Sequence, residues 1–204
     1  MPAAKDSPQD DTWLAEGKKA PDFTLAADQG PAVKLSSLKG GPVVVYFYPR
    51  DDTPGCTREA CAFRDRSGEL KAHGATVLGI STDDVKSHGK FRDKFQLNFP
   101  LLADVDHRTA EAFGAWREKN MYGKKSMGIQ RSTFLIDSAG IVRKVWRKVN
   151  VDGHDAEVLA ALAELGAAAE KPAPAAKAAK KPAAKKKPAA PAKSKGSKKA
   201  PKRS

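Results

Sequence analysis

The hydrophobic positions of the chain form short continuous apolar runs separated by stretches with helical spacing. Residues 41–48 (GPVVVYFY) and 75–82 (ATVLGIST) are apolar runs rich in β-branched and aromatic residues, as in buried strands. Residues 54–74 lie between these runs and 83–97 follow them, and both stretches have the apolar spacing of amphipathic helices. The first of these predicted helices ends at Gly74, a typical helix stop.

The rest of the body predicts further strands and helices. In order these are a short strand at 99–104, a short helix at 108–116, a loose loop at 117–130, strands at 131–137 and 141–149 joined by a hairpin turn, and a helix at 154–165. Alternating strands and helices followed by a hairpin and a helix predict an α/β fold with a central mixed β-sheet flanked by helices. This order is that of a thioredoxin-like domain, with two additional strands before it at 21–28 and 32–35.

Charge divides the chain into a body and a tail. The net charge is +13, but residues 1–170 hold 24 basic and 24 acidic side chains, and residues 171–204 hold 13 basic and no acidic ones. The tail consists of Lys, Ala and Pro with a little Ser and Gly, so it cannot bury enough apolar surface to offset its ordering entropy. We predict a flexible segment at 1–16, a folded domain at 17–168 and a disordered tail at 169–204.

The chain contains no recognisable targeting or metal-binding pattern. Its N-terminal sequence MPAAKDSPQDD is acidic and lacks an apolar core, and no apolar run approaches the ~18 residues of a membrane span. Two cysteines fit a reducing cytosol, where a close pair is more often catalytic or metal-binding than structural. Zinc is not expected, because the histidines show no paired ligand spacing. We expect all four at the surface: His73, His88, His107 and His154.

Cys56 lies in the first turn of the predicted helix that follows the strand at 41–48. Unpaired backbone N–H groups and the positive end of the helix dipole point at this position, and both favour a thiolate over a thiol. Thr53, at the predicted N-cap, can place a hydroxyl close by, and Pro49 can exclude water and fix the backbone. Arg131, at the start of a strand, is the best-placed cation to complete the site.

The pattern Pro49-x-x-x-Thr53-x-x-Cys56 resembles the active-site motif of the peroxiredoxins. The second cysteine, Cys61, together with MYGKKSMGIQRSTFLID, is similar to the Q-type (bacterioferritin comigratory protein) subgroup. The resemblance runs over roughly 17–165. It implies a thiol peroxidase that reduces hydrogen peroxide and organic hydroperoxides, needs no metal, haem or flavin, and is recycled by thioredoxin or a similar dithiol. We expect a monomer.

The same resemblance implies a role for each residue of the motif. Cys56 would be the peroxidatic cysteine, which attacks the O–O bond and becomes sulfenic acid. Thr53 and Arg131 would orient the peroxide and stabilise the charge that develops in the transition state. Pro49 would shield the sulfenate, and Cys61 would be the resolving cysteine.

The spacing of the two cysteines constrains how they could form a disulfide. In an intact α-helix, residues five apart have Cα atoms roughly 8–9 Å apart. A disulfide needs a Cα separation of no more than about 7 Å. We therefore predict that the first turns of the helix unwind before Cys56 and Cys61 bond.

Simpler interpretations remain for several of these residues. Cys61 can be a buried apolar residue, with an external thiol acting as resolver, and Arg131 can be a surface cation. A general thiol-disulfide oxidoreductase is the first alternative function, although that class places Cys-x-x-Cys at the helix start. The second is a non-enzymatic nucleic-acid-coating protein whose body is only a scaffold.

The tail resembles the C-terminal tails of linker histones in composition. Its cations suit a polyphosphate, and because it has no aromatic residue to stack on bases, binding to DNA would be non-specific. A solubilising role, or binding to anionic lipid or acidic protein, is the alternative. This interpretation predicts a cytoplasmic protein associated with the nucleoid. The tail cations predicted to contact phosphates are Lys180, Lys181, Lys185, Lys186, Lys187, Lys193, Lys195, Lys198, Lys199, Lys202 and Arg203.

Overall fold

The computed structural model describes residues 13–38, 40–121 and 124–169. The chain divides into residues 1–171 and 172–204, and all described residues belong to the first of these units. The tail cations from Lys180 to Arg203 therefore lie outside the described residues.

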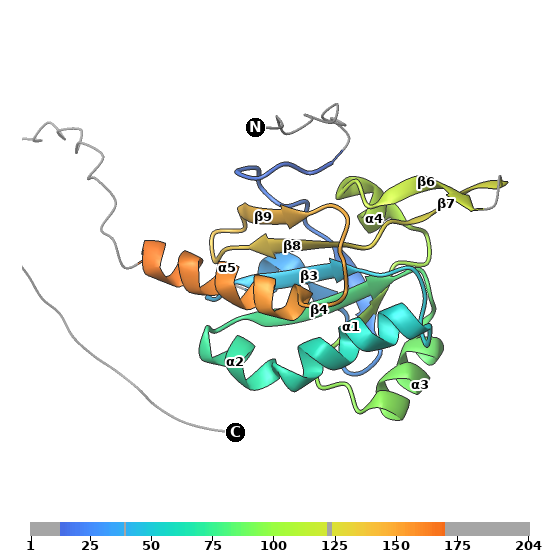
Figure 1. Ribbon diagram of the computed structural model, residues 1–204, viewed down its shortest axis with the longest axis horizontal. Coiled ribbons are helices and arrows are strands. Elements are labelled where there is room, and N and C mark those ends of the chain that lie inside the picture. The colour runs from blue at the N-terminus through green and yellow to red at the C-terminus, as the bar shows by residue number, and fades with distance from the viewer. Residues whose placement is uncertain (1–12, 39, 122–123, 170–204) are drawn as a thin grey trace, which may run out of the picture. The chain divides into compact units, whose positions relative to one another are not determined.

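The described part of the chain contains both helices and strands (Figure 1). The helices are the 3-10 helix η1 (Leu35–Ser37) and α1 (Pro54–Asp65), α2 (Ser67–Ala72), α3 (Val85–Phe95), α4 (Arg108–Ala112) and α5 (His154–Ala169). The strands are β1 (Thr24–Ala27), β2 (Val33–Lys34), β3 (Val43–Phe47), β4 (Thr76–Ser81), β5 (Leu101–Ala103), β6 (Trp116–Met121), β7 (Lys124–Ile129), β8 (Ser132–Ile136) and β9 (Val142–Trp146). None of these helices is long and apolar enough to cross a membrane.

Seven strands form one sheet in the order β2-β1-β5-β4-β3-β8-β9. Strand β4 runs parallel to its neighbours β3 and β5, whereas β8 runs antiparallel to β3 and β9. The parallel strands are connected through helices, and the antiparallel pair β8–β9 is the predicted hairpin. The predicted thioredoxin-like α/β fold with a mixed central sheet is confirmed.

Both faces of the sheet are covered, so its inner strands are buried on both sides. Val43, Val45 and Phe47 of β3 lie in one apolar core, with α4 and the segment before β1. Val44 and Tyr46 lie in the other core, with α1, α2, α3 and α5. Figure 1 shows α5 crossing this second face, with α1 and α2 beside it. The continuous apolar run of β3 in the sequence follows from this double burial.

The structure corrects three predicted elements. The predicted helix over 54–74 is two helices, because Arg66 leaves the helical dihedrals (φ −90°, ψ 7°). The helix predicted to reach Trp116 ends at Ala112, and Gly114 follows with a left-handed φ of 77°. The predicted loop at 117–130 is mostly the antiparallel hairpin β6–β7. Polar residues follow one another along this ribbon, so its sequence lacks the apolar alternation of a strand that packs on a core.

The last residues of the predicted N-terminal segment contact the body. The ring of Trp13 lies 6.4 Å from that of Phe134. The carboxylate of Glu16 accepts a hydrogen bond from the Val145 backbone N–H at 3.0 Å. Residues 13–16 are thus packed against β8 and β9.

Candidate active site

Cys56 occupies the junction between the end of β3 and the first turn of α1. Thr53 holds the N-cap position with an extended backbone (φ −97°, ψ 151°), and Pro54 is the first helical residue. A proline suits that position because its missing N–H would have no partner there. Cys56 follows in the first turn, and only 1% of its surface is exposed. Its location is therefore the one predicted from the sequence.

Arg131 joins this junction from the segment between β7 and β8. Its Nη2 donates a hydrogen bond to the Cys56 Sγ at 3.2 Å, and its Nη1 donates to the Glu59 carboxylate. A Cβ atom at Gly55 would lie 3.2 Å from that Nη2. The glycine therefore leaves room for the guanidinium beside the cysteine.

Cys56, Glu59 and Arg131 form one electrostatic unit, in which Cys56 and Glu59 are buried and Arg131 is 17% exposed. Burial raises the pKa of Glu59, and although the charge and hydrogen bond of Arg131 lower it, the balance is a pKa of about 7. Burial lowers the pKa of Arg131, but Glu59 and Cys56 outweigh it, so this pKa lies above its usual value. Arg131 therefore stays a cation beside the sulfur, while the charge of Glu59 changes near neutral pH.

The other motif residues lie in the loop that connects β3 to α1. Pro49 is half-buried at its start. The Thr53 side chain makes no capping hydrogen bond; its hydroxyl donates to the Arg50 carbonyl oxygen at 3.2 Å. Thr53 is thus at the predicted cap position without acting as a side-chain cap, and its hydroxyl is oriented by the loop itself.

Both cysteines are free thiols within the intact helix α1. Cys61 is half-buried, in contrast to Cys56. Beyond Cys61 the helix is firmly held: Phe63 is 1% exposed, and Arg64 Nη1 donates to the Phe95 carbonyl oxygen at 2.6 Å. The first half of α1 is held as well, since Glu59 is 2% and Ala60 0% exposed and Glu59 pairs with Arg131.

Sequence reasoning missed Glu59. The signal that could have found it is its spacing, because residues three apart share a helix face, and Glu59 is three after Cys56. An acidic residue on the buried face of a helix needs a cationic partner. Arg131, 72 positions away, is that partner.

The expectation of four surface histidines was wrong for two of them. His88 is fully buried, and His154 is 2% exposed. His88 Nδ1 lies 2.9 Å from an Asp51 oxygen, and His154 Nε2 lies 2.7 Å from the Thr133 hydroxyl. These hydrogen bonds compensate for burial of the rings. No group of three or more potential metal ligands occurs among the residues that the structure describes.

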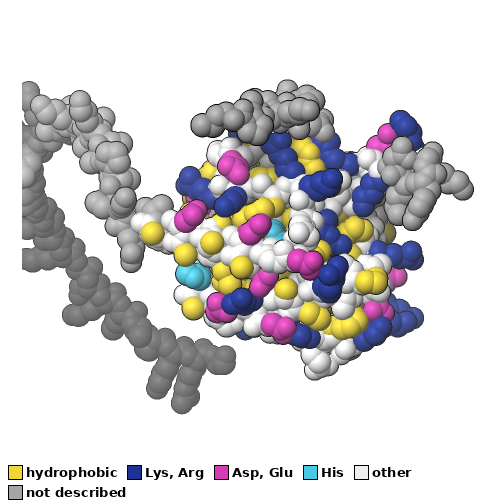
Figure 2. Space-filling model, viewed as in Figure 1, with side chains coloured by type: hydrophobic (Ala, Val, Ile, Leu, Met, Phe, Trp, Pro, Cys, Tyr) yellow, Lys and Arg dark blue, Asp and Glu magenta, His cyan; other side chains and the backbone are white. Residues whose placement is uncertain are grey.

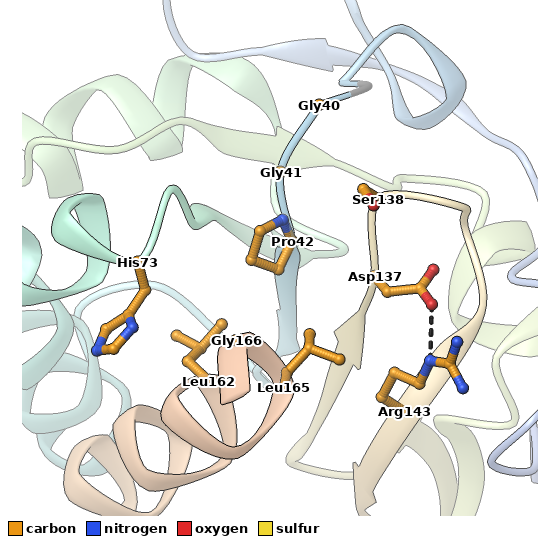
Figure 3. Close-up of a pocket in the computed structure, with 10 residues that line it drawn as sticks. All are labelled: Gly40, Gly41, Pro42, His73, Asp137, Ser138, Arg143, Leu162, Leu165 and Gly166. Carbon is orange, nitrogen blue, oxygen red and sulfur yellow. Dashed lines mark hydrogen bonds and ion pairs between the residues drawn. The ribbon is translucent and has the colours of Figure 1, made fainter. Parts of the chain in front are cut away.

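A cavity of about 490 Å³ lies at the opposite end of β3. Figure 3 shows Pro42, Leu162, Leu165 and the ion pair of Asp137 with Arg143 around it. Gly40 to Pro42 precede β3, whereas Cys56 follows its other end. The cavity is therefore separate from the cysteine site.

Comparisons with known proteins agree with this geometry. Residues 16–145 match the AhpC/TSA family. The chain is 53% identical to the putative peroxiredoxin Bcp of Coxiella burnetii over 72% of this chain and 97% of that protein. It is 51% identical to peroxiredoxin Bcp of Bacillus subtilis over 73% of this chain and 95% of that one.

The chain belongs to the peroxiredoxin Bcp/PrxQ family. It is a thiol peroxidase. Among solved structures, the bacterioferritin comigratory protein of Xanthomonas campestris, described for its alkyl peroxide reduction activity, has a TM-score of 0.68 and 45% identity, covering 70% of this chain and 91% of that one. The PrxQ of Xylella fastidiosa has a TM-score of 0.70 and 37% identity, covering 77% and 98%. Between 70% and 77% of this peroxiredoxin thus covers 91–98% of the length of these four relatives.

Proposed function

We propose that this peroxiredoxin reduces hydrogen peroxide and organic hydroperoxides through Cys56. The supporting observation is the hydrogen bond of 3.2 Å from the Arg131 guanidinium to the buried Cys56 Sγ at the start of α1. A cation and a helix start together favour the thiolate, which is the nucleophilic form. The Arg131 guanidinium that donates to the sulfur can also stabilise charge on a peroxide.

The first step is the attack of the Cys56 thiolate on one oxygen of the O–O bond. That bond breaks, the sulfur is oxidised to sulfenic acid, and the other oxygen leaves and takes a proton to become water or an alcohol. Arg131 orients the peroxide and stabilises the leaving oxygen. The Thr53 hydroxyl, which donates its proton to the Arg50 carbonyl oxygen, accepts a hydrogen bond from the peroxide O–H and so orients it. Pro49 shields the sulfenic acid from water.

In the second step the Cys61 thiol attacks the sulfenic sulfur. A Cys56–Cys61 disulfide forms and water leaves; thioredoxin or a similar dithiol then reduces the disulfide. Because an intact helix holds Cα atoms five residues apart roughly 8–9 Å from each other, the first half of α1 unwinds for this step. Unwinding separates Cys56 and Glu59 from Arg131 and exposes Ala60, which is 0% exposed in the intact helix. The exposed pair of Arg58 with Asp152 at 3.1 Å adds little resistance.

One set of variants tests both steps. Peroxide consumption is measured with thioredoxin as donor for the wild type, Cys56→Ser and Cys61→Ser. We expect Cys56→Ser to be inactive and Cys61→Ser to turn over only with an external thiol. Full activity of Cys56→Ser would overturn the proposal. Far-UV spectra and amide exchange that are identical in the dithiol and disulfide forms would overturn the unwinding step.

We also propose that the basic tail binds DNA without sequence specificity and so places a monomeric, cytoplasmic peroxidase at the nucleoid. The support is compositional: 13 cations and no acidic or aromatic residue in 171–204. If the tail neutralises about 6–10 phosphates, affinity falls ~10³–10⁵-fold between 50 and 200 mM salt. A chain truncated after Glu170 should lose DNA retention but keep its peroxidase turnover. Equal DNA retention by the truncated chain would contradict this role.

A further inference from the structure

A second buried cluster lies beside the active-site loop, centred on the Asp51 carboxylate. Its Oδ1 accepts a hydrogen bond from the Tyr48 hydroxyl at 2.7 Å. Its Oδ2 accepts one from the Ser87 hydroxyl at 2.7 Å and lies 2.9 Å from His88 Nδ1. The Asp51 side chain is 5% exposed and that of His88 is 0% exposed. Three side chains, two of them on α3, thus hold a carboxylate of the β3–α1 loop.

The backbone of the loop is held at the same point. The Asp51 N–H donates to the Asp83 carboxylate at 2.8 Å, and the same oxygen accepts from the Ser81 hydroxyl at 2.7 Å. Asp52, the next residue, has a left-handed φ of 53°, uncommon for a residue other than glycine. Its carboxylate pairs with Lys94 at 2.7 Å. The loop conformation is therefore fixed from β4 and from both ends of α3.

The cluster favours an ionised Asp51. Burial raises the pKa of this carboxyl, but the hydrogen bond and charge of His88, with the hydrogen bonds from Ser87 and Tyr48, lower it below its usual value. A buried carboxylate is tolerated only when donors surround it. The His88 ring contacts both Asp51 oxygens through Nδ1, at 3.1 and 2.9 Å, and packs against the Tyr48 ring. Asp51 and His88 therefore hold each other in place.

We propose that Asp51 and His88 are positioning residues for the peroxide step. They hold the β3–α1 loop in the conformation that places Pro49 and Thr53 beside Cys56. The loop connects them directly: Asp51 is two residues before Thr53, whose hydroxyl is bonded to the Arg50 carbonyl within the same loop. This inference rests on the proposed role of Cys56.

The position of the cluster predicts which step depends on it. Peroxide reduction needs Thr53 and the start of α1 in their folded positions, because the reacting groups must be aligned. Disulfide formation needs the first half of α1 to leave those positions. Loosening the loop should therefore slow the first step and leave the second step no slower.

The test uses Asp51→Asn, which keeps the shape of the side chain and removes its charge, and His88→Phe, which keeps a ring without Nδ1. The first step is measured in full-length protein that also carries Cys61→Ser, by trapping sulfenic acid at increasing hydrogen peroxide. The second step is measured with Cys61 present, as disulfide formation at saturating hydrogen peroxide.

We expect each variant to lower the second-order rate constant of the first step by about tenfold. The double variant should lose no more than either single one, because the two residues act as a unit. The rate of disulfide formation should not fall. If both steps slow together, or the first step keeps its wild-type rate constant, the inference is wrong.

A matched control separates positioning from stability. Asp104 is also a fully buried carboxylate, which accepts hydrogen bonds from the Thr109 and Ala110 backbone N–H groups at the start of α4, in the core on the other face of the sheet. Asp104→Asn should lower the melting temperature and leave both rate constants unchanged.

If Asp51→Asn does not fold, Ser87→Ala takes its place; it removes only the hydrogen bond of the half-buried Ser87 hydroxyl to Asp51, so we expect a smaller loss in the same step. Cys56→Ser separates failure of the positioning role from failure of the proposed peroxidase function. When that variant is inactive but Asp51→Asn and Ser87→Ala react at the wild-type rate, positioning fails and the proposed function stands. Activity of Cys56→Ser overturns both.

Discussion

The two ends of the central sheet each hold an arginine paired with a carboxylate, but only one pair meets a nucleophile. Where β3 ends, Arg131 pairs with Glu59 and reaches Cys56; the exposures of the two paired side chains are 17% and 2%. Where β3 begins, Arg143 pairs with Asp137 beside the cavity of Figure 3, and Arg143 is 51% exposed. The cavity of about 490 Å³ lies at the start of β3, whereas the nucleophilic cysteine lies at its end.

The difference follows from the direction of the chain. A helix that follows β3 starts at the strand's carboxyl end, and its unpaired N–H groups favour negative charge there. The cavity end meets the last turns of α2 and α5 instead, through His73 and Leu165. The space-filling view adds that charged side chains of both signs are spread over the face that carries α5 (Figure 2). The reactive end is the one at which a helix starts, with its unpaired N–H groups beside Cys56.

Replacing either Arg131 or Arg143 by methionine, an uncharged side chain of similar length, should give the largest difference in peroxidase activity between the two ends. Arg131→Met removes the donor to Cys56, and we expect kcat/KM for hydrogen peroxide to fall about 10²–10³-fold, as for loss of a transition-state donor. Arg143→Met should stay within about twofold of the wild type, because a surface pair contributes little. Steady-state peroxide assays decide this. Equal losses in both variants would contradict the comparison.

Glu59 and Asp137, the carboxylates of the two pairs, should change the stability of the fold with pH in opposite directions. The pKa of Glu59 is about 7 in the folded protein, above its unfolded value, so its ionisation destabilises the fold as pH rises from about 4.5 to 7, on the order of 3 kcal/mol. The pKa of Asp137 is lowered, although burial raises it, by the Ile141 backbone and by Arg143. Its contribution is therefore present above its unfolded pKa and lost on acidification.

Urea unfolding at pH 5 and pH 8 measures this. The wild type should lose stability relative to Glu59→Gln as the pH rises, and Asp137→Asn should be less stable than the wild type at both pH values, with the gap closing only in stronger acid. A Glu59→Gln difference that is the same at both pH values would contradict the assignment.

Glu59 also orients Arg131, so its removal should lower activity. We expect Glu59→Ala to lose about tenfold in kcat/KM, since one charge-assisted hydrogen bond contributes about 1.5–3 kcal/mol and part of it is recovered by rearrangement. Glu59→Gln, which keeps an acceptor oxygen, should lose less. Rates measured at pH 8 avoid the titration of Glu59 itself. If Glu59→Gln and Glu59→Ala lose the same factor in kcat/KM, the charge of the Glu59 carboxylate matters and its orientation of Arg131 does not.

The smallest effect is expected in the cavity wall. Leu165 is half-buried near the end of α5, so Leu165→Ala should lower the free energy of unfolding by about 1 kcal/mol. Its peroxidase rate should equal that of the wild type. A change in kcat/KM beyond about twofold would show that the cavity end communicates with Cys56.

The sequence by itself determined the features that are local in the chain. The buried strand β3, the helix start that holds Cys56 and the hairpin β8–β9 follow from apolar runs, a proline and a turn, each readable within about ten residues. The division between a neutral body and a basic tail follows from composition alone. Arg131 was placed at the site by resemblance to a family and by its position at a strand start.

Only the tertiary structure decided the partners that are distant in sequence. Glu59 meets Arg131, and Asp51 meets His88 on α3, because β3, α1, α3 and the segment before β8 converge at one end of the sheet. Periodicity states which face of an element is buried, but not which polar group on another element will face it. The hairpin β6–β7 escaped prediction for a related reason: its strands pair with each other along a polar ribbon, and backbone pairing leaves no apolar pattern in the sequence.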